Sequence, residues 1–148
     1  DPDAGFARVG LRRAQERAKL HAQFDHYLDR PARLYAAEPR ANAGKLLTAA
    51  GEAPPGEPHL KRKIGELREL LALASTPVTV TLHSDGATDV MVYHVSRLGR
   101  FDSYELELLP GDYTIVGSRP GYRDVRKVIS LRPGMRVPPL QVRCEEAI

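Results

Sequence analysis

The segment "LLPGDYTIVGSRPGYRDVRKVISLRPG", residues 108–134, repeats a Pro-Gly pair three times. In such a pair, proline presets the φ of one central turn residue, and glycine supplies the positive φ that a type II turn needs at the next. Between the pairs lie Val, Ile, Leu, Tyr and Thr, residues that favour β-strands. We therefore predict consecutive antiparallel strands over residues 112–118, 122–131 and 136–143, joined by such turns.

The same two-residue period extends upstream to Pro77. Apolar and polar residues alternate over residues 78–82 and 105–108, as in half-buried strands, and Val90 and Val92 alternate with Met91 and Tyr93. Each glycine of the quoted segment leads into a strand, whereas a phosphate-binding loop would lead from clustered glycines into a helix. The segment is therefore predicted to be the frame of a β domain rather than a phosphate site.

Before Pro77 the apolar spacing is helical instead. One stripe follows the 3.6-residue period most clearly: Leu60, Ile64, Leu67, Leu71 and Ala74. Similar spacing predicts helices over residues 3–28, 39–50 and 59–75. Helices followed by strands indicate segregated units rather than a βαβ sheet. The predicted fold class is α+β: an N-terminal three-helix segment (1–76) packed next to a C-terminal antiparallel β-sandwich of about six strands (77–148).

The composition is that of a globular chain. The 148 residues are 42% hydrophobic and 28% charged, enough for one ordinary domain or two small units. No apolar run is long enough to span a membrane, and no signal peptide is expected at the start. A single cysteine, Cys144, excludes an internal disulfide. The net charge of +3 arises wholly before residue 77 and is small for a nucleic-acid binder.

Catalytic and metal-binding patterns are weak. No serine lies in a G-x-S-x-G motif, and Glu105 and Glu107 alternate with leucines, as on a solvated strand face. The turn "HSDGATD" (83–89) is the best metal candidate, but Asp-Gly is also ordinary hairpin chemistry. We predict no enzyme activity, no catalytic residue, no cofactor and no bound metal ion.

A basic cluster around one turn is the remaining chemical signal, and we predict it as the partner-binding site: Arg119, Tyr122, Arg123 and Arg126. The alternatives are a solvated surface, an acidic protein or glycan partner, and nucleic acid, which would need more aromatic residues among the basic ones. No acidic residue closer in sequence than Asp124 competes for Arg119 and Arg123, so we expect both to project freely. An exposed strand edge is the other candidate contact.

The quoted segment resembles the PEGA-type surface domain. Its hallmarks are a Pro-Gly-x-Tyr strand (110–113), a Gly-Tyr turn (121–122) and a strand ending in glycine (134). The first half is similar to the last helices of a tetratricopeptide-type array. The whole chain resembles the C-terminal part of proteobacterial envelope proteins that combine the two.

This resemblance implies a noncatalytic structural or protein-interaction module of a larger bacterial envelope protein. The implied location is periplasmic or envelope-associated, within a membrane-anchored parent chain, and the implied partner is an envelope protein, with acidic character suiting the basic cluster. A cell-wall polysaccharide is the alternative partner. Sugar-binding faces usually carry Trp or Tyr platforms and amide side chains, and this sequence has no Trp and a single Asn, Asn42. The protein partner is therefore favoured, and no nucleic acid is expected.

Overall fold

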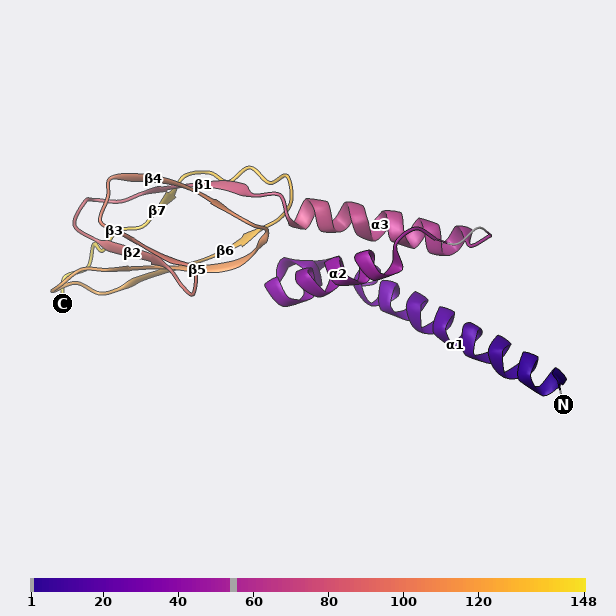
Figure 1. Cartoon of the computed structure of the whole chain (residues 1–148). Helices are drawn as coiled ribbons and strands as arrows, with labels where there is room; N and C mark the ends of the chain where they lie inside the picture. The colour runs from indigo at the N-terminus through magenta and orange to yellow at the C-terminus, as the bar shows by residue number, and fades with distance from the viewer. Residues whose placement is uncertain (1, 54–55) are drawn as a thin grey trace. The chain divides into compact units, whose positions relative to one another are not determined.

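The computed structural model of the chain describes residues 2–53 and 56–148. Within them, three α-helices and a short 3-10 helix precede seven β-strands (Figure 1). The contacts divide the chain into two compact units, Asp1–Ala72 and Leu73–Ile148, which we call the helical unit and the β unit. The α+β class predicted from the sequence is confirmed, with seven strands where about six were expected.

The helical unit begins with the 27-residue helix α1 (Pro2–Leu28). It ends before Pro31, which lacks the N–H that a helix interior needs and restricts the residue before it. The 3-10 helix η1 (Pro31–Tyr35) leads into α2 (Ala37–Ala50), which ends at Gly51 with a φ of 59°. Helix α3 (Pro58–Ala74) starts on a proline, whose missing N–H has no partner at a helix start in any case.

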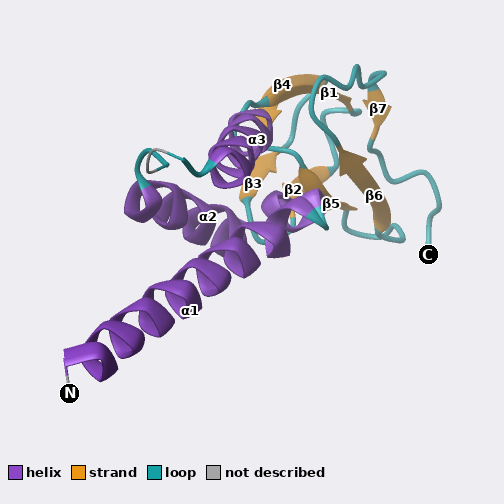
Figure 2. Ribbon diagram, turned by 90° about the vertical axis from the view of Figure 1, so that its right-hand side faces the viewer, coloured by secondary structure: helices purple, strands orange, loops and turns teal. Residues whose placement is uncertain are grey.

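The core of the helical unit lies under the predicted stripes. Leu60, Ile64 and Leu67 of α3 are buried, as are Phe24 and Tyr27 of α1. Every residue from Ala7 to Lys19 is exposed, so the N-terminal half of α1 extends beyond the packed part of this unit (Figure 2). The burial of the α3 stripe confirms the helical period read from the sequence.

The β unit contains two sheets that face each other across one core (Figure 1). The three-stranded sheet has the order β4-β1-β7, and the four-stranded sheet has the order β3-β2-β5-β6. The strands are β1 (Val78–His83), β2 (Asp89–Val92), β3 (Ser96–Gly99), β4 (Ser103–Leu108), β5 (Gly111–Ser118), β6 (Val125–Leu131) and β7 (Leu140–Gln141). All pairings are antiparallel except β1 with β7.

The prediction for residues 136–143 is wrong. Only Leu140 and Gln141 form a strand, and they pair in parallel with β1 in the other sheet instead of following β6. Pro138 and Pro139 precede this strand, and neither can donate to a ladder. The strand expected from residue 122 also starts later, at Val125.

Gly121 and Gly134 have the φ that a type II turn needs, 82° and 72°, whereas Gly111 has a φ of 158°, which is extended backbone. At the first pair, by contrast, Gly111 is already the first residue of β5 and pairs with Leu131. The hydroxyl of Tyr113 donates to the Leu109 carbonyl at 2.6 Å across this pair. The chain there passes directly from one sheet to the other.

Candidate functional site

The turn before β6 brings two of the four predicted site residues together. The Arg119 guanidinium carbon lies 4.2 Å from the centroid of the Tyr122 ring, a cation–π contact. The Tyr122 N–H donates to the Arg119 carbonyl at 3.0 Å, which closes the turn. Arg119 also lies 3.9 Å from a carboxylate oxygen of Asp85. Arg119 is thus held between a ring and a carboxylate of its own unit.

The other two predicted residues point elsewhere. Arg123 lies 3.9 Å from a carboxylate oxygen of Glu146, and both side chains are largely exposed. Arg126 stands opposite Val116 in the β5–β6 ladder and is exposed. The expectation that no acidic residue competes for Arg119 and Arg123 is wrong, because Asp85 and Glu146 approach them from distant parts of the chain.

The C-terminal tail fixes the same turn from the other side. Tyr122 forms an antiparallel bridge with Ala147. The Arg123 N–H donates to the Glu146 carbonyl at 2.8 Å, and the Ile148 N–H donates to the Gly121 carbonyl at 2.9 Å. The backbone of this turn therefore already forms hydrogen bonds with the C-terminal tail of the same chain.

The "HSDGATD" turn connects β1 of one sheet to β2 of the other, so the hairpin expected from its Asp-Gly pair does not form. One carboxylate oxygen of Asp85 accepts hydrogen bonds from the backbone N–H groups of Ala87 and Thr88, at 3.0 and 2.9 Å. Desolvation of this carboxyl raises its pKa, but the hydrogen bonds from Ala87 and Thr88, with the charge of Arg119, outweigh it and lower the pKa overall. Asp89 forms an ion pair with Arg97, whose hydrogen bond lowers the Asp89 pKa. Among the described residues, no group of three His, Cys, Asp or Glu is arranged to hold a metal ion.

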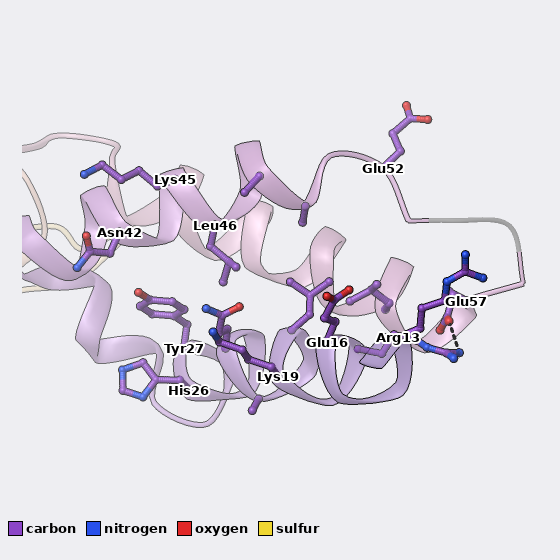
Figure 3. Close-up of a pocket in the computed structure, with 17 residues that line it drawn as sticks. Arg13, Glu16, Lys19, His26, Tyr27, Asn42, Lys45, Leu46, Glu52 and Glu57 are labelled. Carbon is purple, nitrogen blue, oxygen red and sulfur yellow. Dashed lines mark hydrogen bonds and ion pairs between the residues drawn. The ribbon is translucent and has the colours of Figure 1, made fainter. Parts of the chain in front are cut away.

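A groove of about 1020 Å³ lies in the helical unit, mainly between α1 and α2 (Figure 3). Leu20 and Tyr27 of α1 contribute to its apolar lining, opposite Leu46 and Ala49 of α2. Leu60 of α3 also contributes. Leu20 and Leu46 are only half-buried, and Ala49 is exposed. These helices therefore leave apolar surface open to an occupant.

The rim of this groove carries both signs of charge. Arg17 and Glu57 form an ion pair at 2.9 Å, which ties α1 to the segment before α3 (Figure 3). The other charged residues of the rim are Arg13, Glu16, Lys19, Lys45 and Glu52. With the Arg17–Glu57 pair set aside, three basic and two acidic side chains remain, so an occupant with slight acidic character suits the rim best.

Sequence reasoning did not identify this groove. Leu46 and Ala50 have the spacing of an inward helix face, and the period alone predicts their burial. The structure leaves both half-buried, and Ala22 of α1, which lines the groove with them, is itself exposed. Small residues on both helices could have indicated a groove. Which of these residues face each other, however, depends on the tertiary structure.

No protein-family model matches the chain, and no curated protein matches it either. In the part of the chain that the structure describes, no helix has the length and apolar character needed to cross a membrane.

Proposed function

We propose that this chain is a noncatalytic protein-interaction module whose helical unit holds an apolar segment of another protein in the α1–α2 groove. The observation that carries the proposal is the half-buried leucine lining, Leu20 and Leu46, in an open groove of about 1020 Å³. Partly exposed apolar surface with a polar rim is typical of peptide-binding sites. A location in the bacterial envelope is part of the proposal and rests on the resemblance of residues 108–134.

The basic turn supports a partner site less well than the groove does. Arg119 already has a ring and a carboxylate as neighbours, and Arg123 has Glu146. A partner would have to displace these contacts. The groove requires no such exchange. A glycan in the groove is also disfavoured, because Tyr27 in its lining is 9% exposed and offers no open stacking platform. The other ring of the lining, His26, stands edge-on to Tyr27 and is hydrogen-bonded to Arg33.

A peptide-display selection on the purified chain tests the proposal. We expect enriched peptides with an apolar anchor and acidic flanking residues. Their binding should be lost in Ala49→Trp, because the indole would fill the groove from an exposed position on α2. The matched control is Ala41→Trp, an exposed alanine of the same helix outside the groove lining, which should bind as the natural chain does.

Two results would contradict the proposal. Selected peptides that bind Ala49→Trp as tightly as the natural chain would place their site elsewhere. Retention on insoluble peptidoglycan that is unaffected by Ala49→Trp, with no peptide enriched, would favour the glycan alternative.

A further inference from the structure

Charge pairing within the β unit leaves a distinct remainder. The unit has nine basic and nine acidic side chains. Five of each form ion pairs inside the unit: Arg97–Asp89, Arg119–Asp85, Arg123–Glu146, Arg132–Asp112 and Arg143–Glu145. Four of each sign form no ion pair among the described residues: Arg100, Arg126, Lys127 and Arg136, and Asp102, Glu105, Glu107 and Asp124. Of these, Arg126 and Lys127 lie on β6, and Glu105 and Glu107 lie on β4. Both β4 and β6 are edge strands.

The backbone of β6 offers hydrogen-bonding groups at its open edge. The Tyr93 N–H donates to the Thr114 carbonyl at 2.8 Å, so the backbone groups of Thr114 face β2. Because these groups alternate sides along a strand, those of Ile115 face β6, where Lys127 is its partner. The N–H and C=O groups of Arg126, Val128 and Ser130 therefore point away from the sheet. All three residues are exposed, Val128 to 71%.

The same reasoning applies to β4. The Val142 N–H donates to the His83 carbonyl at 2.8 Å, so the backbone groups of His83 face β7. Those of Leu82 then face β4, where Tyr104 is its partner. The backbone groups of Ser103, Glu105 and Glu107 therefore point outward, and all three residues are exposed.

The two open edges lie on opposite sides of the β unit. Strands β4 and β7 flank β1 on its two sides. Gln141 of β7 lines one groove together with Val125 and Lys127 of β6, so β6 lies on the β7 side (Figure 2). One side of the unit thus presents the acidic strand β4. The other side presents the basic strand β6, beside a C-terminal segment whose Glu145 and Glu146 line the same groove and form ion pairs with Arg143 and Arg123.

We propose that copies of this chain associate head to tail, with the acidic edge strand β4 of one copy added to the basic edge strand β6 of the next. Like charges on an edge normally prevent it from pairing with a second copy of itself. Here they disfavour β6–β6 and β4–β4 pairing, while β4–β6 pairing brings opposite charges together. A contact between two different surfaces does not close on itself as a twofold dimer does, so it generates chains or rings of copies.

The strand lengths indicate one register. An antiparallel pairing that uses all of β4 sets Arg126 opposite Glu107 of a second copy and Ser130 opposite Ser103 of that copy. Every outward backbone group of one strand then meets an outward group of the other. On the inward face, Val125 lies opposite Leu108 of the second copy, while Lys127 lies opposite Leu106 of that copy, so Arg126 and Glu107 are the pair of opposite charges in direct register.

Sedimentation velocity of the full chain over a wide concentration series tests this proposal. We expect the average mass to rise with concentration and the rise to be suppressed by high salt, which screens exposed charges. Arg126→Glu and Glu107→Arg should each weaken association at least about tenfold, because each sets like charges opposite one another. An equimolar mixture of the two variants should recover association, because each then offers the edge that the other requires.

Two further variants complete the test. Arg136→Glu makes the same charge change at an exposed residue outside both strands, in the loop between β6 and β7, and it should leave association unchanged. Val128→Pro removes an outward N–H without removing a bond to β5, and it should block association in a chain whose melting curve is retained. A chain that stays monomeric at every concentration would overturn the proposal. So would association that survives Arg126→Glu, since it would then use another surface, such as the exposed half of α1.

Discussion

Gly117 of β5 is the position where a single methyl group should test the packing of the β unit most directly. A Cβ built there would lie 2.9 Å from Cγ2 of Thr88 and 3.3 Å from Cγ1 of Val142. Two carbon atoms are comfortable at about 3.5–4.0 Å. Thr88 and Val142 are both fully buried, so neither can swing into solvent. Gly117→Ala therefore forces a well-packed core to shift.

The magnitude follows from two opposing effects. Overpacking of this kind costs about 1–3 kcal/mol. Replacing glycine also lowers the conformational entropy of the unfolded chain, which stabilises the folded state by about 0.4–1 kcal/mol. We expect a net loss of about 1–2 kcal/mol in the free energy of unfolding, and a unit of this size loses about 4–8 °C in melting temperature per kcal/mol. Gly65→Ala is the matched control: nothing lies near its Cβ inside α3, so it should stabilise by about 0.5–1 kcal/mol.

A second substitution identifies the clashing atom. Thr88→Ser removes the Cγ2 methyl and keeps the hydroxyl oxygen that accepts the Cys144 N–H at 3.1 Å. The double variant Gly117→Ala/Thr88→Ser should therefore be more stable than the two single losses predict, as measured by urea unfolding in a double-mutant cycle. Gly117→Ala with the stability of the natural chain, or strictly additive losses, would refute the close-packing argument.

Three other substitutions test the helical core, the turn and the acid response. Leu67→Ala should cost about 2–5 kcal/mol in urea unfolding because Leu67 is fully buried, and a loss below about 0.5 kcal/mol would contradict a core role. Gly121→Val should cost more than about 1 kcal/mol, since φ is 82° there and a β-branched residue is strained; natural stability would contradict this turn. The lowered pKa of Asp85 means that its stabilisation is complete above the unfolded value of about 3.9 and is lost as pH falls through the lower folded value. Asp85→Asn should therefore lose less stability between pH 5 and pH 2 than the natural chain, and parallel pH curves would contradict this.

Local patterns predicted the elements well where they depend on period and turn chemistry. The α3 stripe and the glycines at 121 and 134 are examples. Burial on one helix face and a positive φ both depend on residues that are close in sequence. The hairpin between β2 and β3 was not predicted, because its turn lacks the residues that mark a turn in the sequence. Its turn has no glycine, and His94 takes a φ of 60° there. Histidine is one of the non-glycine residues enriched at positive φ, but a single histidine does not locate a turn.

The candidate site was harder to predict because charge pairing is set by topology. Arg119 and Asp85 are distant in sequence, and the β2–β5 pairing of Asp89 with Ser118 brings their neighbourhoods together. Reversing both Arg119 and Arg123 to Glu would therefore oppose the carboxylates of Asp85 and Glu146, so the variant would alter stability as well as any partner contact. Arg126, by contrast, has no ion pair among the described residues, and its reversal leaves the internal pairs intact. Reversal of Arg126 on the edge strand is therefore more informative than reversal of Arg119 and Arg123 at the turn. At Arg126, an effect on partner binding can be measured separately from an effect on folding.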